Sequence, residues 1–222
     1  MMKKTFLALA GFVAFSAMTI SCSGGQKSEN TVTASDSVAT SAVLSDTSLK
    51  VDSASSYLTW RGFKPGGEHF GKLPVTSGEV SIADSKLFGG NVTIAMNGII
   101  VEDLQGETAA QLKGHLESAD FFEVEKFPTA RFELTGVPAE GLDIATLKEL
   151  QGNLTLKDVT KNITIPVASI ETVAEGTKIT SATFRINRAD WNVKYGSKSF
   201  FTGLGDKFID DEIELSFTLI AR

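Results

Sequence analysis

The stretch ARFELT, residues 130–135, places apolar and polar side chains at alternate positions. Successive side chains of a β-strand point to opposite faces, so this period of two predicts a strand with one dry face and one wet face. Strands that are wet on one side are typical of antiparallel sheets, because both faces of a parallel sheet are covered. The same alternation recurs in residues 92–96, 154–156, 163–167, 182–186 and 213–219.

Only one stretch, within residues 104–122, shows a convincing helical period. Its stripe consists of Leu104, Thr108, Leu112, Leu116 and Ala119. One helix cannot cover the dry faces of so many strands, so the sheet must roll up against itself as a barrel or as two packed sheets. A barrel of about eight strands is just wide enough to be filled by side chains or to enclose a slim ligand.

Turn residues separate the predicted strands. Gly89-Gly90-Asn91 and Lys157-Asp158 are expected to be such turns. The triplets that begin at Asn91, Asn153 and Asn162 match the N-glycosylation pattern, but we expect them simply to occupy the wet faces of strands.

The first residues have the pattern of an export signal. Lys3 and Lys4 precede an apolar run over residues 5–20, too short for a comfortable bilayer span. The run ends at Cys22, the single cysteine of the chain, and the preceding Thr-Ile-Ser resembles a lipobox. We therefore expect residues 1–21 to be a lipoprotein signal peptide and Cys22 to carry acyl chains such as palmitate.

Residues 22–48 are expected to be the lipidated N-terminus and a flexible tether, because residues 23–48 are rich in small and polar residues and contain no aromatic one. No second linker follows, so residues 49–222 are expected to form one domain. Removing residues 1–21 takes away two lysines and no acid, which changes the formal charge from −6 to −8. Membrane attachment must then come from the acyl chains, and nucleic acid is not an expected partner. We expect an exported lipoprotein of the cell envelope, periplasmic or surface-facing, with the outer membrane as the expected site.

Motifs for familiar catalysis are absent from the sequence. One cysteine and two histidines leave little material for a metal site, and no cofactor is expected. His69 and His115 could act as bases with Asp103 or Asp120, so a hydrolase-type enzyme stays an alternative. The acidic group at residues 206–212 lacks the spacing of a calcium loop. We expect a protein without catalytic residues.

Aromatic residues are spread over nearly every predicted element. Rigid rings can line a cavity without collapsing into it, so the set favours an apolar tunnel over a plain aromatic core. The expected tunnel residues are Trp60, Phe63, Phe70, Phe88, Phe121, Phe122, Phe132, Phe184, Trp191, Phe201 and Phe217. At the tunnel mouth, polar contacts to a head group are expected from His69, Arg188, Tyr195 and Lys198.

Three stretches together resemble the YceI family of exported bacterial lipid-binding proteins. They are GHLESADFFEVEKFPTARF at residues 114–132, GNLTLKDVTK at residues 152–161, and INRADWNV at residues 186–193 with DDEIEL at residues 210–215. Residues 51–53, 58–60 and 69–71 fit the opening strands of the family. The segment at residues 195–206 departs from it, as an insertion before the last strand that could reshape the tunnel mouth.

The resemblance implies a lipocalin-like antiparallel barrel of about eight strands, with one helix and a C-terminal closing strand. It also implies an apolar tunnel for a polyisoprenoid, a quinone or a fatty-acid chain. The protein would then be a lipid carrier, scavenger or stress-related reservoir tethered to the envelope. Besides the hydrolase-type enzyme, a scaffold module with a filled core stays open as an alternative, because fold alone determines function only loosely.

Overall fold

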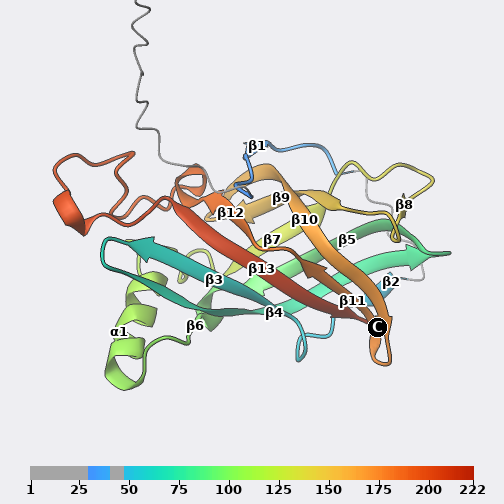
Figure 1. Cartoon of the computed structure of the whole chain (residues 1–222), viewed down its shortest axis with the longest axis horizontal. Coiled ribbons are helices and arrows are strands. Elements are labelled where there is room, and N and C mark those ends of the chain that lie inside the picture. The colour runs from blue at the N-terminus through green and yellow to red at the C-terminus, as the bar shows by residue number, and fades with distance from the viewer. Residues whose placement is uncertain (1–29, 41–47) are drawn as a thin grey trace, which may run out of the picture.

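Eight antiparallel strands close on themselves in the computed structural model, which describes residues 30–40 and 48–222. Each strand pairs with the next around the ring, and the pairing of β4 with β5 completes the circle (Figure 1). The predicted all-β barrel of about eight strands is therefore confirmed. The ring runs in the order β4 (Gly67–Ala83), β3 (Tyr57–Lys64), β13 (Glu212–Ala221), β11 (Gly176–Ser181), β10 (Val159–Val173), β9 (Glu149–Leu156), β7 (Thr129–Leu134) and β5 (Lys86–Ala95).

The two longest strands, β4 and β10, have 17 and 15 residues and change partner midway. β4 pairs with β3 up to Pro74 and with β5 from Val75 onward. β10 pairs with β9 up to Pro166 and with β11 from Val167 onward. A register shift follows each change of partner. Bulges bend a strand and proline has no N–H to donate, so both features suit a corner where the sheet folds over.

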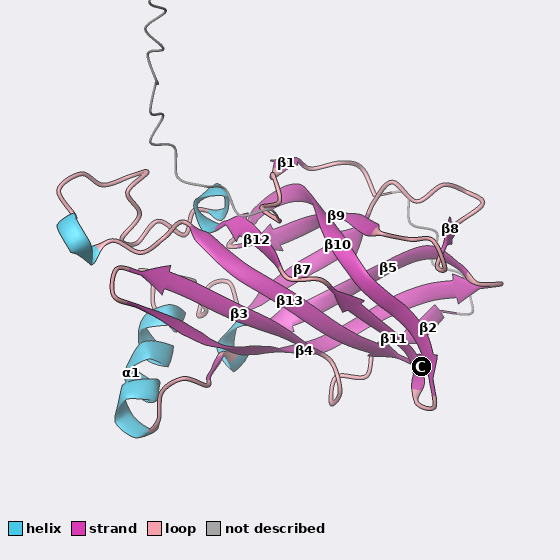
Figure 2. Ribbon diagram, viewed as in Figure 1, coloured by secondary structure: helices cyan, strands magenta, loops and turns pink. Residues whose placement is uncertain are grey.

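Short outer strands use the parts of the edges that the ring leaves free (Figure 2). β2 (Ser48–Lys50) and β6 (Ile100–Val101) pair with β4. β8 (Leu142–Asp143) pairs with β5, and β12 (Phe184–Asn187) pairs with β13. These additions matter because an exposed strand edge is a template for unwanted pairing.

Residues 30–40 lie along the barrel wall, although their composition predicted a flexible tether. The N–H of Val32 donates to the carbonyl oxygen of Arg185 at 2.8 Å, and the N–H of Arg185 donates to the carbonyl oxygen of Asn30 at 3.0 Å. Further along, β1 (Ser35–Asp36) pairs with β10. The segment thus joins β12 to β10 in the part of the wall where those two strands do not pair, and the tether prediction is wrong for these residues.

Two asparagines hold this segment. The side chain of Asn153 accepts a hydrogen bond from the N–H of Val38 at 3.1 Å and donates one to its carbonyl oxygen at 2.6 Å. The amide of Asn162 donates to Thr135 and to Asn153 at 2.9 and 3.0 Å. The wet-face prediction is wrong here, because Asn153 and Asn162 are only 7% and 2% exposed. Buried amides need such partners.

One predicted turn is confirmed and the other is wrong. Lys157 and Asp158 have φ angles of 48° and 64°, as a two-residue hairpin turn requires. Gly89-Gly90-Asn91 lies instead within β5. A Cβ at Gly90 would lie 3.2 Å from the carbonyl oxygen of Glu79, so glycine serves close strand approach there rather than a turn.

The predicted helix forms as α1 (Gly106–Glu117), shorter than the 104–122 window. It lies at the same end of the barrel as the loop that contains η3 (Gly205–Lys207), on the left in Figure 1, and the C-terminus lies at the other end. Two further 3-10 turns are η1 (Met96–Gly98) and η2 (Arg188–Trp191). No described helix has the length and apolar character needed to cross a bilayer.

Gly71 provides a test of the close packing of β6 on β4. A Cβ at this position would lie 1.8 Å from the carbonyl oxygen of Ile100 and 3.1 Å from the ring of Trp60. We expect Gly71→Ala to lower the free energy of unfolding, measured in urea, by about 3 kcal/mol, because the backbone itself must move. Gly62→Ala is the control, since a Cβ there meets nothing within 4 Å. Equal effects of the two changes would contradict this packing.

Candidate functional site

The barrel encloses a cavity of about 420 Å³. Its walls come from the inward faces of the ring strands, with α1 and the loop around η3 at one end. The interior is therefore not filled by side chains, which contradicts a filled-core module. Of the aromatic residues predicted to line a tunnel, those that line the cavity are Trp60, Phe63, Phe121, Phe122, Phe132, Phe184 and Phe217.

The other predicted tunnel residues lie elsewhere. Phe70 is directly opposite Arg61 on the outer face of the β3–β4 hairpin, and the Arg61 guanidinium lies 4.8 Å from its ring centroid. Phe88 packs beside Gly141, outside the cavity lining. Trp191 is fully buried in η2, where its indole N–H donates to the carbonyl oxygen of Leu154 at 3.0 Å. Phe201 is 49% exposed.

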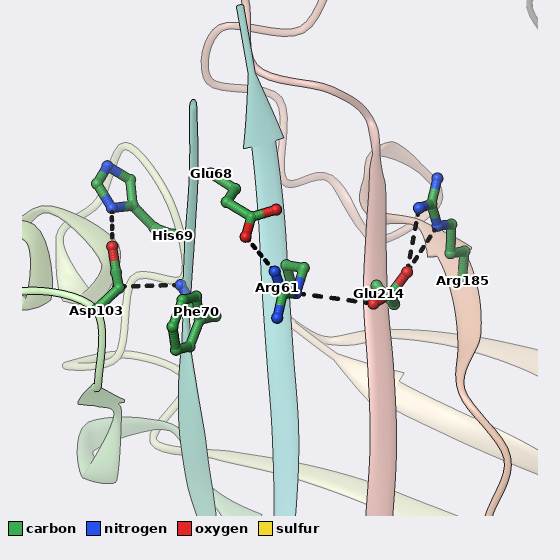
Figure 3. Close-up of polar contacts among 7 residues, drawn as sticks. All are labelled: Arg61, Glu68, His69, Phe70, Asp103, Arg185 and Glu214. Atoms are coloured by element: carbon green, nitrogen blue, oxygen red, sulfur yellow. Dashed lines mark hydrogen bonds and ion pairs between the residues drawn. The ribbon is translucent and has the colours of Figure 1, made fainter. Parts of the chain in front are cut away.

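Polar and charged residues gather at one end of the cavity. Among them, His69 faces the interior because it alternates with the outward Phe70. Its Nδ1 lies 2.7 Å from Asp103 Oδ2 (Figure 3). Its Nε2 lies 2.9 Å from the Lys64 ammonium. We call this group the rim; it consists of Lys64, His69, His115, Arg188, Asp206 and Lys207.

Asp103 fixes the orientation of His69. Burial alone would raise the pKa of Asp103, but hydrogen bonds from His69 and from the N–H of Phe70 hold this pKa below its ordinary value. The carboxylate therefore stays charged at neutral pH, and it selects the ring position that points Nε2 toward Lys64.

On the outer face, a row of charges crosses four strands (Figure 3). Glu68 on β4 pairs with Arg61 on β3. The Nε of Arg61 lies 3.8 Å from Glu214 on β13. Glu214 also pairs with Arg185 on β12 at 3.1 Å. The sequence motif search did not reveal this row, because its members become neighbours only through strand pairing.

His115 and Tyr195 join α1 to the loop before β13. Their rings meet edge to face at 4.6 Å, and both rings contact Phe121, at 5.4 and 5.7 Å between centroids. His115 Nε2 lies 3.9 Å from Asp120 Oδ2. Tyr195 itself is not among the residues that line the cavity. The helical stripe contributes Leu112 and Leu116 to the lining, which places α1 beside this end of the cavity.

Arg188 lines the cavity, but its polar atoms are committed to the protein. The side chain is 1% exposed. It donates to the carbonyl oxygens of Val193, Asp210 and Ile209 at 2.7, 3.0 and 3.1 Å, and it pairs with Asp211 at 3.4 Å. Burial lowers the pKa of Arg188, and the two aspartates oppose that shift. Arg188 therefore ties both ends of the loop together, whereas the sequence had suggested contact with a head group.

Lys198 is likewise absent from the cavity lining. Its ammonium lies 3.2 Å from the ring centroid of Phe208, a residue that does line the cavity. Lys194 makes a similar contact with Phe200 at 4.6 Å. Cys22 and the predicted signal peptide lie outside the described residues.

The role of Arg188 can be measured. Arg188→Met would remove the donor to three carbonyl oxygens, of which that of Val193 is buried, and would leave Asp211 without its partner, so we expect the free energy of unfolding in urea to fall by about 3 kcal/mol. Arg185→Ala is the matched control, because Arg185 is 28% exposed and surface ion pairs contribute at most about 1 kcal/mol. If Arg188→Met lowers the free energy of unfolding no more than Arg185→Ala does, Arg188 does not hold the loop as described.

Comparison with known families gives one match over most of the chain. The profile of a family described as YceI-like domain matches residues 49–221. The UPF0312 protein of Azotobacter vinelandii is 46% identical over 56 residues, which cover 25% of this chain and 28% of that protein. Protein YceI of Salmonella arizonae is 40% identical over 75 residues, 34% of each. The matched segments thus span about a third of these curated relatives.

Solved structures share the fold at low sequence identity. Burkholderia cenocepacia BcnA has a TM-score of 0.58 and 18% identity, and the match covers 78% of this chain and 99% of that one. A polyisoprenoid binding domain from Saccharophagus degradans has a TM-score of 0.53 and 14% identity, covering 78% and 97%.

Proposed function

The chain belongs to the YceI-like family, and from this premise we propose that its barrel holds one long apolar lipid chain. The observation that carries the proposal is the cavity of about 420 Å³, whose walls are mostly aliphatic and aromatic. A polar ligand would lose its hydration there without gaining partners, which costs several kcal/mol. An apolar chain would instead gain dispersion contacts along the whole wall.

The ligand class that we propose is a polyisoprenoid, a quinone tail or a fatty-acyl chain. The Saccharophagus degradans neighbour is itself a polyisoprenoid binding domain. Burial of each methylene contributes about 0.8 kcal/mol, so a chain of about a dozen carbons would stay bound through purification. One molecule per barrel follows from the single enclosed volume.

The head group would lie at the rim. Arg188 is already engaged by protein groups and both ring nitrogens of His69 have partners, so Lys64 and Lys207 are the donors that remain for it. Their chemistry suits a phosphate, a carboxylate or a carbonyl oxygen. The cavity sets the length of the chain, and the rim sets only the preference for a head group.

We propose a binding protein rather than an enzyme. Asp103 and Lys64 already engage the two nitrogens of the His69 ring, so neither nitrogen is poised to take a proton from a substrate. The ring of His115 is packed between Tyr195 and Phe121. Both histidines thus have structural partners that account for their positions.

In the cell, we propose an envelope lipoprotein that acts as a lipid carrier, scavenger or reservoir. The basis is the sequence alone: a charged and apolar leader followed by Cys22, the single cysteine. Acyl chains on Cys22 would hold the acidic chain to the outer membrane.

Filling the cavity tests the binding proposal. Ala130 is buried and lines the cavity, whereas the next residue, Arg131, is exposed on the other face of β7. We expect native mass spectrometry of protein purified without detergent to detect one apolar molecule per chain. Ala130→Trp should lower this occupancy at least about tenfold, because the indole takes the space of the ligand. Arg131→Trp should retain it. A ligand-free wild type, or equal occupancy in Ala130→Trp, would refute the proposal.

Lipidation is tested separately. We expect Cys22→Ser protein to leave the membrane fraction and lose the mass of the acyl chains, with the barrel still folded, because the contacts described for the barrel involve Asn30 and later residues, not Cys22. Fractionation and intact mass measure both effects. Wild-type recovery of the variant with membranes would count against the lipoprotein.

A further inference from the structure

Two adjacent phenylalanines project into solvent at the end of the barrel where the rim lies. Phe200 and Phe201 are 48% and 49% exposed, and they belong to the segment between η2 and β13. We call residues 192–209 the aromatic loop; it extends beyond the strands at the upper left of Figure 1. Exposed apolar groups that adjoin one another mark interaction sites more often than isolated ones do.

The exposure of these rings is built into the loop. The N–H groups of Phe200 and Phe201 both donate to the carbonyl oxygen of Ser197, at 3.3 and 3.0 Å. The side chain of Ser197 is fully buried and accepts a hydrogen bond from the N–H of Ser199. Ser199 in turn donates to Asp211. The turn that carries the two rings is therefore fixed to the body of the protein.

The aromatic loop is basic in an acidic protein. It carries Lys194, Lys198 and Lys207 against one acid, Asp206. Lys126 and Lys157 add to this charge. Burial is the main cause that lowers the pKa of Lys157, and the nearby charges of Lys126 and Lys194 lower it further, so the three lysines lie close together. The acids nearby are Asp120, Glu123, Asp190, Asp210 and Asp211; Glu123 lies 4.0 Å from Lys126, and Asp211 is paired with Arg188.

We propose that the aromatic loop docks the barrel onto a phospholipid bilayer that contains anionic lipids. Phe200 and Phe201 would enter the boundary between head groups and acyl chains, and the lysines would contact lipid phosphates. Lys194 already lies against the ring of Phe200, so charge and apolar surface reach the membrane together. The inference rests on the proposed function, because docking is useful only if the barrel exchanges a lipid.

Docking at this loop would bring the cavity to the membrane. Asp206, Lys207 and Phe208 belong to the aromatic loop and also line the cavity. A lipid chain could then pass between the bilayer and the cavity beside Phe208, with little exposure to water.

The length of the N-terminal chain agrees with this orientation. Asn30 is fixed beside Arg185, and Thr31 donates to Glu212 at the start of β13. Asn30 lies eight positions after Cys22, and a fully extended chain over eight such steps spans at most about 29 Å. Since β13 starts directly after the aromatic loop, an acylated Cys22 would keep the loop near the membrane.

The experiment uses the chain from residue 22 with Cys22→Ser, which keeps every described residue and removes the anchor. Flotation with vesicles of phosphatidylcholine and about one-third phosphatidylglycerol measures binding. We expect the protein to float with these vesicles, and F200S/F201S to lower the partition coefficient at least about tenfold. K194E/K198E should weaken binding to a similar degree, and added salt should weaken binding of the parent protein.

Y57S is the matched control, because Tyr57 is an exposed aromatic residue at the opposite end of β3 from the rim residue Lys64. It should float like the parent protein. The docking proposal is overturned if the parent fails to float or if F200S/F201S floats equally well. It is also overturned if size-exclusion chromatography detects a dimer that F200S/F201S dissolves, since the loop then serves self-association. Native mass spectrometry of the same samples reports ligand occupancy independently, so an empty but floating barrel would count against the proposed function alone.

Discussion

The structure depends on how two strands share their backbone hydrogen bonds. β4 and β10 each give one half of their length to one neighbour and the other half to another, and proline and a register shift mark the change. A sheet that turns these two corners returns to its own first strand, so the ring has no free edge to aggregate. The cavity is a consequence, because the inward side chains of eight strands do not reach across the enclosed space.

The same change of partner explains the role of residues 30–40. Where β10 turns from β11 to β9, β12 has no neighbour on that side, and the N-terminal segment takes up the exposed backbone groups. The side-chain amide of Asn153 binds both the N–H and the carbonyl oxygen of Val38, as the backbone of a neighbouring strand would. Composition alone marks this segment as a linker, because its small polar residues contribute hydrogen bonds rather than apolar contacts. The barrel wall therefore begins earlier in the chain than its hydrophobic pattern does.

Alternation predicted the fold class because it records directly which face of a strand is dry. It fails for Phe70, an outward apolar residue whose ring lies against the guanidinium of Arg61. The sequence predicts a turn at Gly90 because it does not distinguish a glycine that adopts a turn conformation from one that lets two strands approach closely. Arg188 was assigned to a ligand because the carbonyl oxygens that it binds come from residues up to 22 positions away. Contacts of that kind depend on the path of the loop.

The charged residues that line the cavity lie at one end of the barrel, and this arrangement is what makes the interior selective. Beyond the rim the cavity walls are apolar except for Asn91, so a chain that enters gains contact along its length but few hydrogen bonds that would halt it at one depth. Ion pairs on the outer face join β4, β3, β13 and β12 without any group pointing inward. The wall therefore gains stability from its backbone pairing and its outer surface. Its inner surface is left free to contact whatever apolar chain occupies it.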